Sequence, residues 1–126
     1  MARLAFLALA LVAFAVPAAA QAPLTGTYEL TKPNGDPIES GATWTSVIVP
    51  IPGGGYLEWL FRTAEGQTVL VPDECCIISP PDDTGEHQWQ NNRGTQGKMW
   101  RDSSGQLKSE TTTGRNKGNV VHYKPN

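Results

Sequence analysis

The only two cysteines of the chain, Cys75 and Cys76, are adjacent in the stretch VPDECCIISPPDD, residues 71–83. Neighbouring cysteines can close a disulfide, but ordinary disulfide geometry needs Cα atoms farther apart, so the bond is strained and more readily reduced. It closes almost no loop and therefore adds little to folding stability. We expect this vicinal disulfide to set local shape. Two alternatives remain open: a reduced pair with one thiol facing the core, and a bridge between two chains.

Acidic residues and a histidine surround the two cysteines. Thiolate and imidazole ligands suit zinc or copper, and carboxylates suit calcium. The spacing fits no standard ligand motif, and neighbouring residues point to opposite sides of a strand, so a solvated acidic loop is expected in place of a metal site. The residues that could supply ligands are Asp73, Glu74, Cys75, Cys76, Asp82, Asp83, Glu86 and His87.

Four tryptophans fall on four different expected strands: Trp44, Trp59, Trp89 and Trp100. Trp59 alternates with polar neighbours, which predicts that its indole fills the core. Trp89 and Trp100 lie among polar residues, where an indole could instead stack on a sugar or another flat ligand. We therefore expect a ligand-binding surface that comprises Trp89, Trp100, His87 and Asn91.

Motifs for catalysis are scarce. The chain has two histidines, and it contains no G-x-S-x-G, no H-E-x-x-H and no glycine-rich loop that opens a helix. These features favour a protein that binds without catalysing, with no catalytic residue, cofactor or metal. A redox or metal-dependent protein centred on Cys75, Cys76 and His87 is the alternative, and it requires a reactive thiolate.

An N-terminal export signal precedes the part of the chain that must position these residues. Arg3 is followed by an apolar run over 4–16 and by the small-residue site Ala18-Ala19-Ala20. This pattern predicts a signal peptide over 1–20 and one mature domain over 21–126. The apolar run is shorter than the ~20 residues that a membrane span needs. We expect a periplasmic or secreted protein without a membrane span, in a compartment where disulfides persist.

The mature part shows alternating apolar and polar residues between Gly, Pro, Asn and Asp turns, without the 3.6-residue period of a helix. The expected strands cover 24–31, 44–51, 56–63, 67–72, 86–92, 97–102, 106–113 and 119–124. Connections are too short for crossover helices, which predicts antiparallel pairing. The fold class is therefore all-β: an up-and-down barrel of about eight strands or a barrel-like sandwich.

The core and the lining of this domain follow from the same alternation. Most of the core is expected to comprise Tyr28, Leu30, Leu57, Trp59, Phe61, Val69, Val71 and Tyr123. The strands after residue 86 carry few apolar residues. They form either a thin wall with one apolar side or a polar lining around a wet cavity.

Charge is divided unevenly along a chain whose net charge is −2. Residues 21–86 hold ten acids against two bases, whereas residues 87–126 hold seven bases against two acids. The simplest interpretation is that the two parts neutralise each other in the folded domain, and the alternative is a basic face for an anionic partner. Export and net acidity argue against nucleic-acid binding. A structural envelope protein that self-associates through these parts remains a third functional alternative.

Gly26-Thr27-Tyr28, at the start of the first expected strand, resembles the G-x-W opening of lipocalin-like (calycin-type) barrels, with Tyr28 in the place of tryptophan. Arg115, near the last strand, is similar to the arginine that covers that residue in the family. The chain is shorter than most lipocalins and lacks their C-terminal helix. The resemblance implies an eight-stranded barrel that binds a small molecule or an extracytoplasmic protein partner.

Overall fold

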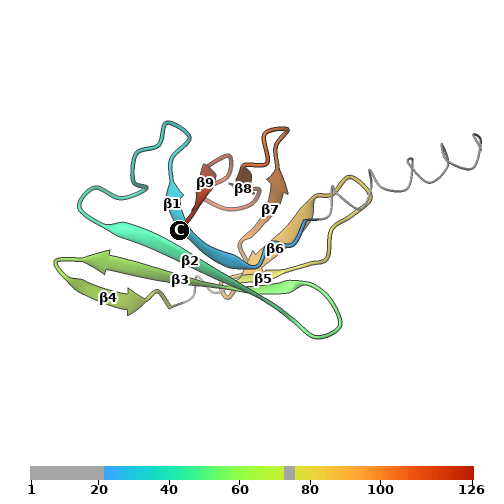
Figure 1. Cartoon of the computed structure of the whole chain (residues 1–126), viewed down its shortest axis with the longest axis horizontal. Coiled ribbons are helices and arrows are strands. Elements are labelled where there is room, and N and C mark those ends of the chain that lie inside the picture. Colours follow the sequence, from blue (N-terminus) through green and yellow to red (C-terminus); the bar gives the residue numbers. More distant parts are fainter. Residues whose placement is uncertain (1–21, 73–75) are drawn as a thin grey trace, which may run out of the picture.

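The computed structural model describes residues 22–72 and 76–126, which form a closed antiparallel β-barrel of eight strands plus one extra strand (Figure 1). The strands are β1 (Gly26–Thr31), β2 (Thr43–Pro50), β3 (Tyr56–Ala64), β4 (Gln67–Leu70), β5 (Cys76–Ile78), β6 (His87–Asn91), β7 (Gln96–Arg101), β8 (Leu107–Thr111) and β9 (Val120–Pro125). The described ranges contain no helix long and apolar enough to cross a membrane. The expected signal peptide, residues 1–20, lies outside them.

The barrel closes because β3 pairs with strands on both of its edges. One edge pairs with β2 along its whole length, and the other pairs with β5 over Tyr56–Glu58 and with β4 over Phe61–Ala64. The ring then runs through β6, β7, β8 and β9 back to β1, which pairs with β2. The β4 strand pairs with β3 alone and lies outside this ring, as the green hairpin in Figure 1 shows. The all-β, antiparallel prediction is confirmed.

Inward-facing side chains fill one end of the barrel and leave room at the other. At the end where β1 begins, which we call the closed end, the interior is packed by Leu24, Tyr28, Ile48, Ile78, Met99 and Leu107. At the open end, the β1–β2 connection (32–42) and the β8–β9 connection (112–119) surround a pocket. Of the expected core, Tyr28, Leu30 and Tyr123 are buried, as predicted.

The predicted inward face of β3 was wrong. Leu57, Trp59 and Phe61 were expected to point into the core, but Trp59 is 37% exposed and Glu58 is only 2% exposed. Glu58 pairs with Ile48 on β2 and Cys76 on β5, which are both buried, so its position in the register faces the interior. Hydrogen bonds inside the barrel compensate the cost of burying this carboxyl. Leu57, Trp59 and Phe61 lie on the opposite face of β3.

Val69 was also expected in the core, and this prediction was wrong as well. Its side chain is 52% exposed because β4 lies beyond the ring and covers no part of the interior. Val71, just after β4, is only half-buried, and its N–H donates to the carbonyl of Leu60 at 2.9 Å. The expected hairpin between β3 and β4 is present, with Glu65 (φ 53°) and Gly66 (φ 78°) in the left-handed conformations of a two-residue turn.

The arginine expected to cover Tyr28 does not do so. Arg115 is exposed in the β8–β9 connection at the open end. The ring of Tyr28 instead meets Tyr123 edge-to-face, with centroids 5.6 Å apart, and its hydroxyl donates to the carbonyl of Leu24 at 2.7 Å.

Candidate functional site

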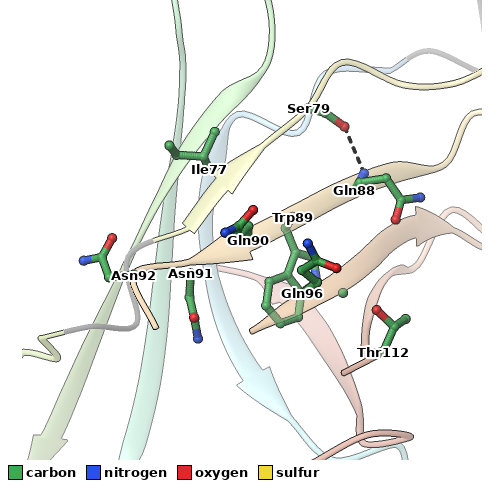
Figure 2. Close-up of a pocket in the computed structure, with 10 residues that line it drawn as sticks. Ile77, Ser79, Gln88, Trp89, Gln90, Asn91, Asn92, Gln96 and Thr112 are labelled. Carbon is green, nitrogen blue, oxygen red and sulfur yellow. Dashed lines mark hydrogen bonds between the residues drawn. The ribbon is translucent and has the colours of Figure 1, made fainter. Parts of the chain in front are cut away.

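The expected ligand-binding residues of β6, which are His87, Trp89 and Asn91, alternate along the strand with two exposed glutamines. Trp89 packs against the interior core, whereas its neighbours Gln88 and Gln90 are exposed outside. Figure 2 shows the Trp89 indole and the Gln90 amide leaving β6 in opposite directions.

The outer groove seen in Figure 2 has a volume of about 550 Å³ and a lining rich in amides. Its lining residues are Ile77, Ser79, Gln88, Trp89, Gln90, Asn91, Asn92, Gln96, Gly97 and Thr112. Two of the four expected site residues, Trp89 and Asn91, border this groove. The Asn91 side chain also accepts the backbone N–H groups of Arg93 and Thr95, each at 3.0 Å, which shapes the β6–β7 turn.

The other two expected site residues, His87 and Trp100, border a second groove of about 500 Å³ at the closed end. His87 is buried, with Nδ1 2.8 Å from the carbonyl of Ser79 and its ring edge-on to Tyr56. Trp100 is half-buried, and Lys98 Nζ lies 5.5 Å from the centre of its ring. The structure therefore divides the four expected residues between two grooves.

A third cavity, which we call the interior pocket, lies within the barrel near its open end and has a volume of about 260 Å³. Its lining comprises Leu30, Ile38, Trp44, Glu58, Leu60, Cys76, Trp89, Ser109, Thr111, Asn116, Asn119, Val121 and Tyr123. Seven strands and both open-end connections contribute to it. Apolar walls with a few polar groups are typical of small-molecule sites in barrel mouths.

The polar floor of the interior pocket centres on Glu58. Its Oε2 accepts the hydroxyl of Ser46 at 2.6 Å and the hydroxyl of Tyr123 at 2.6 Å. Burial, followed by the charge of Glu58, raises the pKa of Tyr123 well above its usual value of 10.0. The phenol therefore keeps its proton and remains a donor to the carboxyl. This network joins β2, β3 and β9 beneath the pocket.

Two indoles form walls of the interior pocket, and both have their N–H groups engaged. Trp89 Nε1 donates to the hydroxyl of Ser109 at 3.0 Å, and Trp44 Nε1 donates to Glu39 Oε1 at 2.9 Å. With these groups satisfied, the indoles offer ring carbon to the cavity. Trp89 is thus an expected site residue that lines the interior pocket.

An ion pair holds Trp44 in place at the rim. Arg62 donates from Nε to Glu39 Oε1 at 2.8 Å and from its other guanidinium nitrogen to Glu39 Oε2. The hydrogen bond from Arg62, followed by the one from Trp44, lowers the pKa of Glu39 from 4.5 to about 2. The carboxylate therefore stays charged near neutral pH and fixes the indole.

Cys76 faces the interior pocket and is 6% exposed, whereas Cys75 lies outside the described residues. The vicinal disulfide accordingly remains a prediction. Cys76 pairs with Asn91, and His87 is four residues away along β6, about 13 Å at the rise of a strand. Within the described ranges, no three His, Cys, Asp or Glu side chains gather closely enough to hold a metal ion. The possible ligands Asp73 and Glu74 lie outside those ranges.

Comparison of the chain with family models, with curated proteins and with solved structures finds no match. The similarity to lipocalin-like barrels therefore rests on the architecture and on Gly26-Thr27-Tyr28. The arguments for function come from the interior pocket itself.

Proposed function

We propose that this protein is a non-enzymatic binding module that holds a small, flat ligand in the interior pocket. The observation that carries the proposal is a cavity with two indole walls and a hydrogen-bonded polar floor inside an otherwise packed barrel. Empty cavities lower stability, because their lining atoms lose packing contacts. A pocket kept open beside a buried carboxyl is therefore better explained by ligand binding than by folding.

The volume of the pocket limits the ligand. A cavity of about 150 Å³ is enough for benzene. The interior pocket, at about 260 Å³, therefore accommodates one aromatic ring with a short polar arm. The proposal places this binding in the periplasm or outside the cell, in keeping with the export signal expected over 1–20.

Titration with 2-phenylethanol tests the proposal. We expect the probe to shift the NMR signals of the Trp89 and Trp44 indole N–H groups, since both rings line the pocket. Thr111→Trp, at the pocket, should weaken binding by roughly tenfold or more, an energy of about 1.4 kcal/mol or above. Thr112→Trp is the matched control, because the next residue along the chain borders the outer groove.

The two variants separate the two cavities. Loss of binding in Thr112→Trp with retention in Thr111→Trp would assign the ligand to the outer groove and contradict the proposal. Absence of any shift at the two indoles at millimolar probe would contradict it as well.

A further inference from the structure

We infer that the interior pocket selects small organic cations, namely an aromatic ring that carries a protonated amine, with Glu58 as the group that anchors the amine. The inference rests on the proposed function, because it names the ligand class of the same pocket. Three features of the pocket support it: the state of the carboxyl, the charges of the lining and the chemistry of the walls.

The geometry at Glu58 is that of a carboxylate. A single oxygen, Oε2, accepts the hydroxyls of Ser46 and Tyr123, each at 2.6 Å. Hydrogen bonds from hydroxyl groups to ionised oxygens fall between about 2.5 and 2.7 Å. Contacts of 2.6 Å fall within this range. On this ground we take the floor of the pocket to be negatively charged.

The lining gives the pocket a single sign of charge. Glu58 is the one ionised side chain among the described lining residues, and the others are apolar, hydroxyl, thiol or amide groups. Arg62, at the rim, is bonded to Glu39, so this pair adds no net charge. Glu58 is 2% exposed, and a charge so enclosed acts on a ligand with far less screening than one at the surface.

The walls favour the same ligand class. Trp44 and Trp89 present ring surface to the cavity, and a cation near the face of an indole is attracted to its π electrons. Ser109 and Thr111 also line the pocket, and hydroxyl oxygens can accept N–H groups. An anionic ligand would meet repulsion from Glu58 in every pose that reaches the floor.

The network around Glu58 also ties three strands together, and a purely structural role would predict no preference for ligand charge.

Calorimetric titration with three probes that share a phenyl ring distinguishes the two roles. The probes are phenethylamine as the cation, 2-phenylethanol as the neutral molecule and phenylacetate as the anion. We expect phenethylamine to bind roughly tenfold or more tighter than 2-phenylethanol, as a charge-assisted hydrogen bond would give, and phenylacetate to bind weakest. In Glu58→Gln, the preference for the amine should fall to within about threefold.

The outcomes separate this inference from the proposed function. Equal or tighter binding of 2-phenylethanol or phenylacetate to the natural chain overturns the cation class and leaves the binding function standing. An amine preference that persists in Glu58→Gln overturns the role of Glu58. If none of the three probes binds, both proposals fall for ligands of this size. The comparison on the natural chain decides the ligand class even if Glu58→Gln fails to fold.

Discussion

The indole of Trp89 occupies the space that a side chain at Gly97 would need. The two residues are directly opposite each other in the β6–β7 pair, and a Cβ placed on Gly97 would overlap the Trp89 ring and the backbone oxygen of Glu110. Glycine at this position allows the ring to lie against the β7 backbone and form a wall of the interior pocket. The absence of a side chain at Gly97 thus leaves room for the indole of Trp89.

Gly97→Ala should destabilise the protein, because the added methyl group forces the indole or the β7–β8 pair to move. Overpacking of this kind costs about 1–3 kcal/mol, which urea unfolding can measure. In a Trp89→Leu background the cost should shrink but not vanish, since the backbone oxygen of Glu110 remains. Gln96→Ala, at the exposed neighbouring position, is the control and should stay within about 0.5 kcal/mol of the natural chain. Equal effects of Gly97→Ala and Gln96→Ala would contradict the close packing.

Tyr123→Phe should cost more stability than Tyr28→Phe. Both rings are buried and both hydroxyls donate one hydrogen bond, but Tyr123 donates to the carboxyl of Glu58 and Tyr28 to a backbone carbonyl. Hydrogen bonds to charged groups contribute about 1.5–3 kcal/mol, against about 1 kcal/mol for neutral pairs. Urea unfolding of the two variants at pH 7 gives the comparison, in which each serves as the control for the other. Equal losses would indicate that Glu58 is uncharged in the folded protein.

The sequence predicted an antiparallel barrel or barrel-like sandwich, but it did not predict which face of β3 lines the interior. Most strand boundaries followed from alternation and from Gly and Pro turns, which are both local signals, but β5 was not expected as a strand. The face of β3 is ambiguous in the same pattern, because Leu57, Trp59 and Phe61 form a better apolar set than Tyr56, Glu58 and Leu60. The register with β2 and β5 decides the matter, since it places Glu58 within reach of Ser46 and Tyr123. Tyr123 lies sixty-five positions away in the chain.

Local sequence patterns were also insufficient to predict the candidate site. Trp89 could be identified from its type, but its polar neighbours left an exposed and a cavity-lining position both open. Strand alternation places the ring and the flanking amides on opposite faces. Asp or Glu within an apolar strand is the one local signal that could have pointed to the floor of the pocket, because a buried charge needs specific partners. Those partners, and the pocket they share, depend on long-range pairing that composition and spacing do not encode.

Glu39→Gln should remove part of the acid sensitivity of the protein. The pKa of Glu39 is lowered from 4.5 to about 2 in the folded chain by its hydrogen bonds with Arg62 and Trp44. A carboxyl with a lowered folded-state pKa stabilises the fold above its unfolded value, and this contribution is lost as pH falls from 4.5 toward about 2. The difference in urea midpoint between the natural chain and Glu39→Gln should therefore be largest near neutral pH and shrink at acid pH.

Other carboxyls titrate over the same range, and the comparison of two chains removes their effect. Hydrogen bonds with Ser104 and then Lys108 lower the pKa of Asp102, so the natural chain and the variant share that loss. If the two chains differ in urea midpoint by the same amount at neutral and at acid pH, the ion pair between Glu39 and Arg62 does not form in solution.

The state of the two cysteines decides what a ligand meets beside Glu58, because Cys76 lines the interior pocket. We expect the protein to contain the Cys75–Cys76 disulfide. Alkylation of the native protein cannot test this, since the burial of Cys76 would also slow the reaction of a free thiol.

The protein should therefore be alkylated in guanidinium, with and without reductant, and its intact mass measured by mass spectrometry. A monomer that takes up no label without reductant and two labels with it, and whose unreduced mass is lower by two hydrogens, would confirm the disulfide. Labelling of both thiols without reductant would contradict it and leave a thiol facing the ligand, and a mass of twice the chain would show a bridge between two molecules.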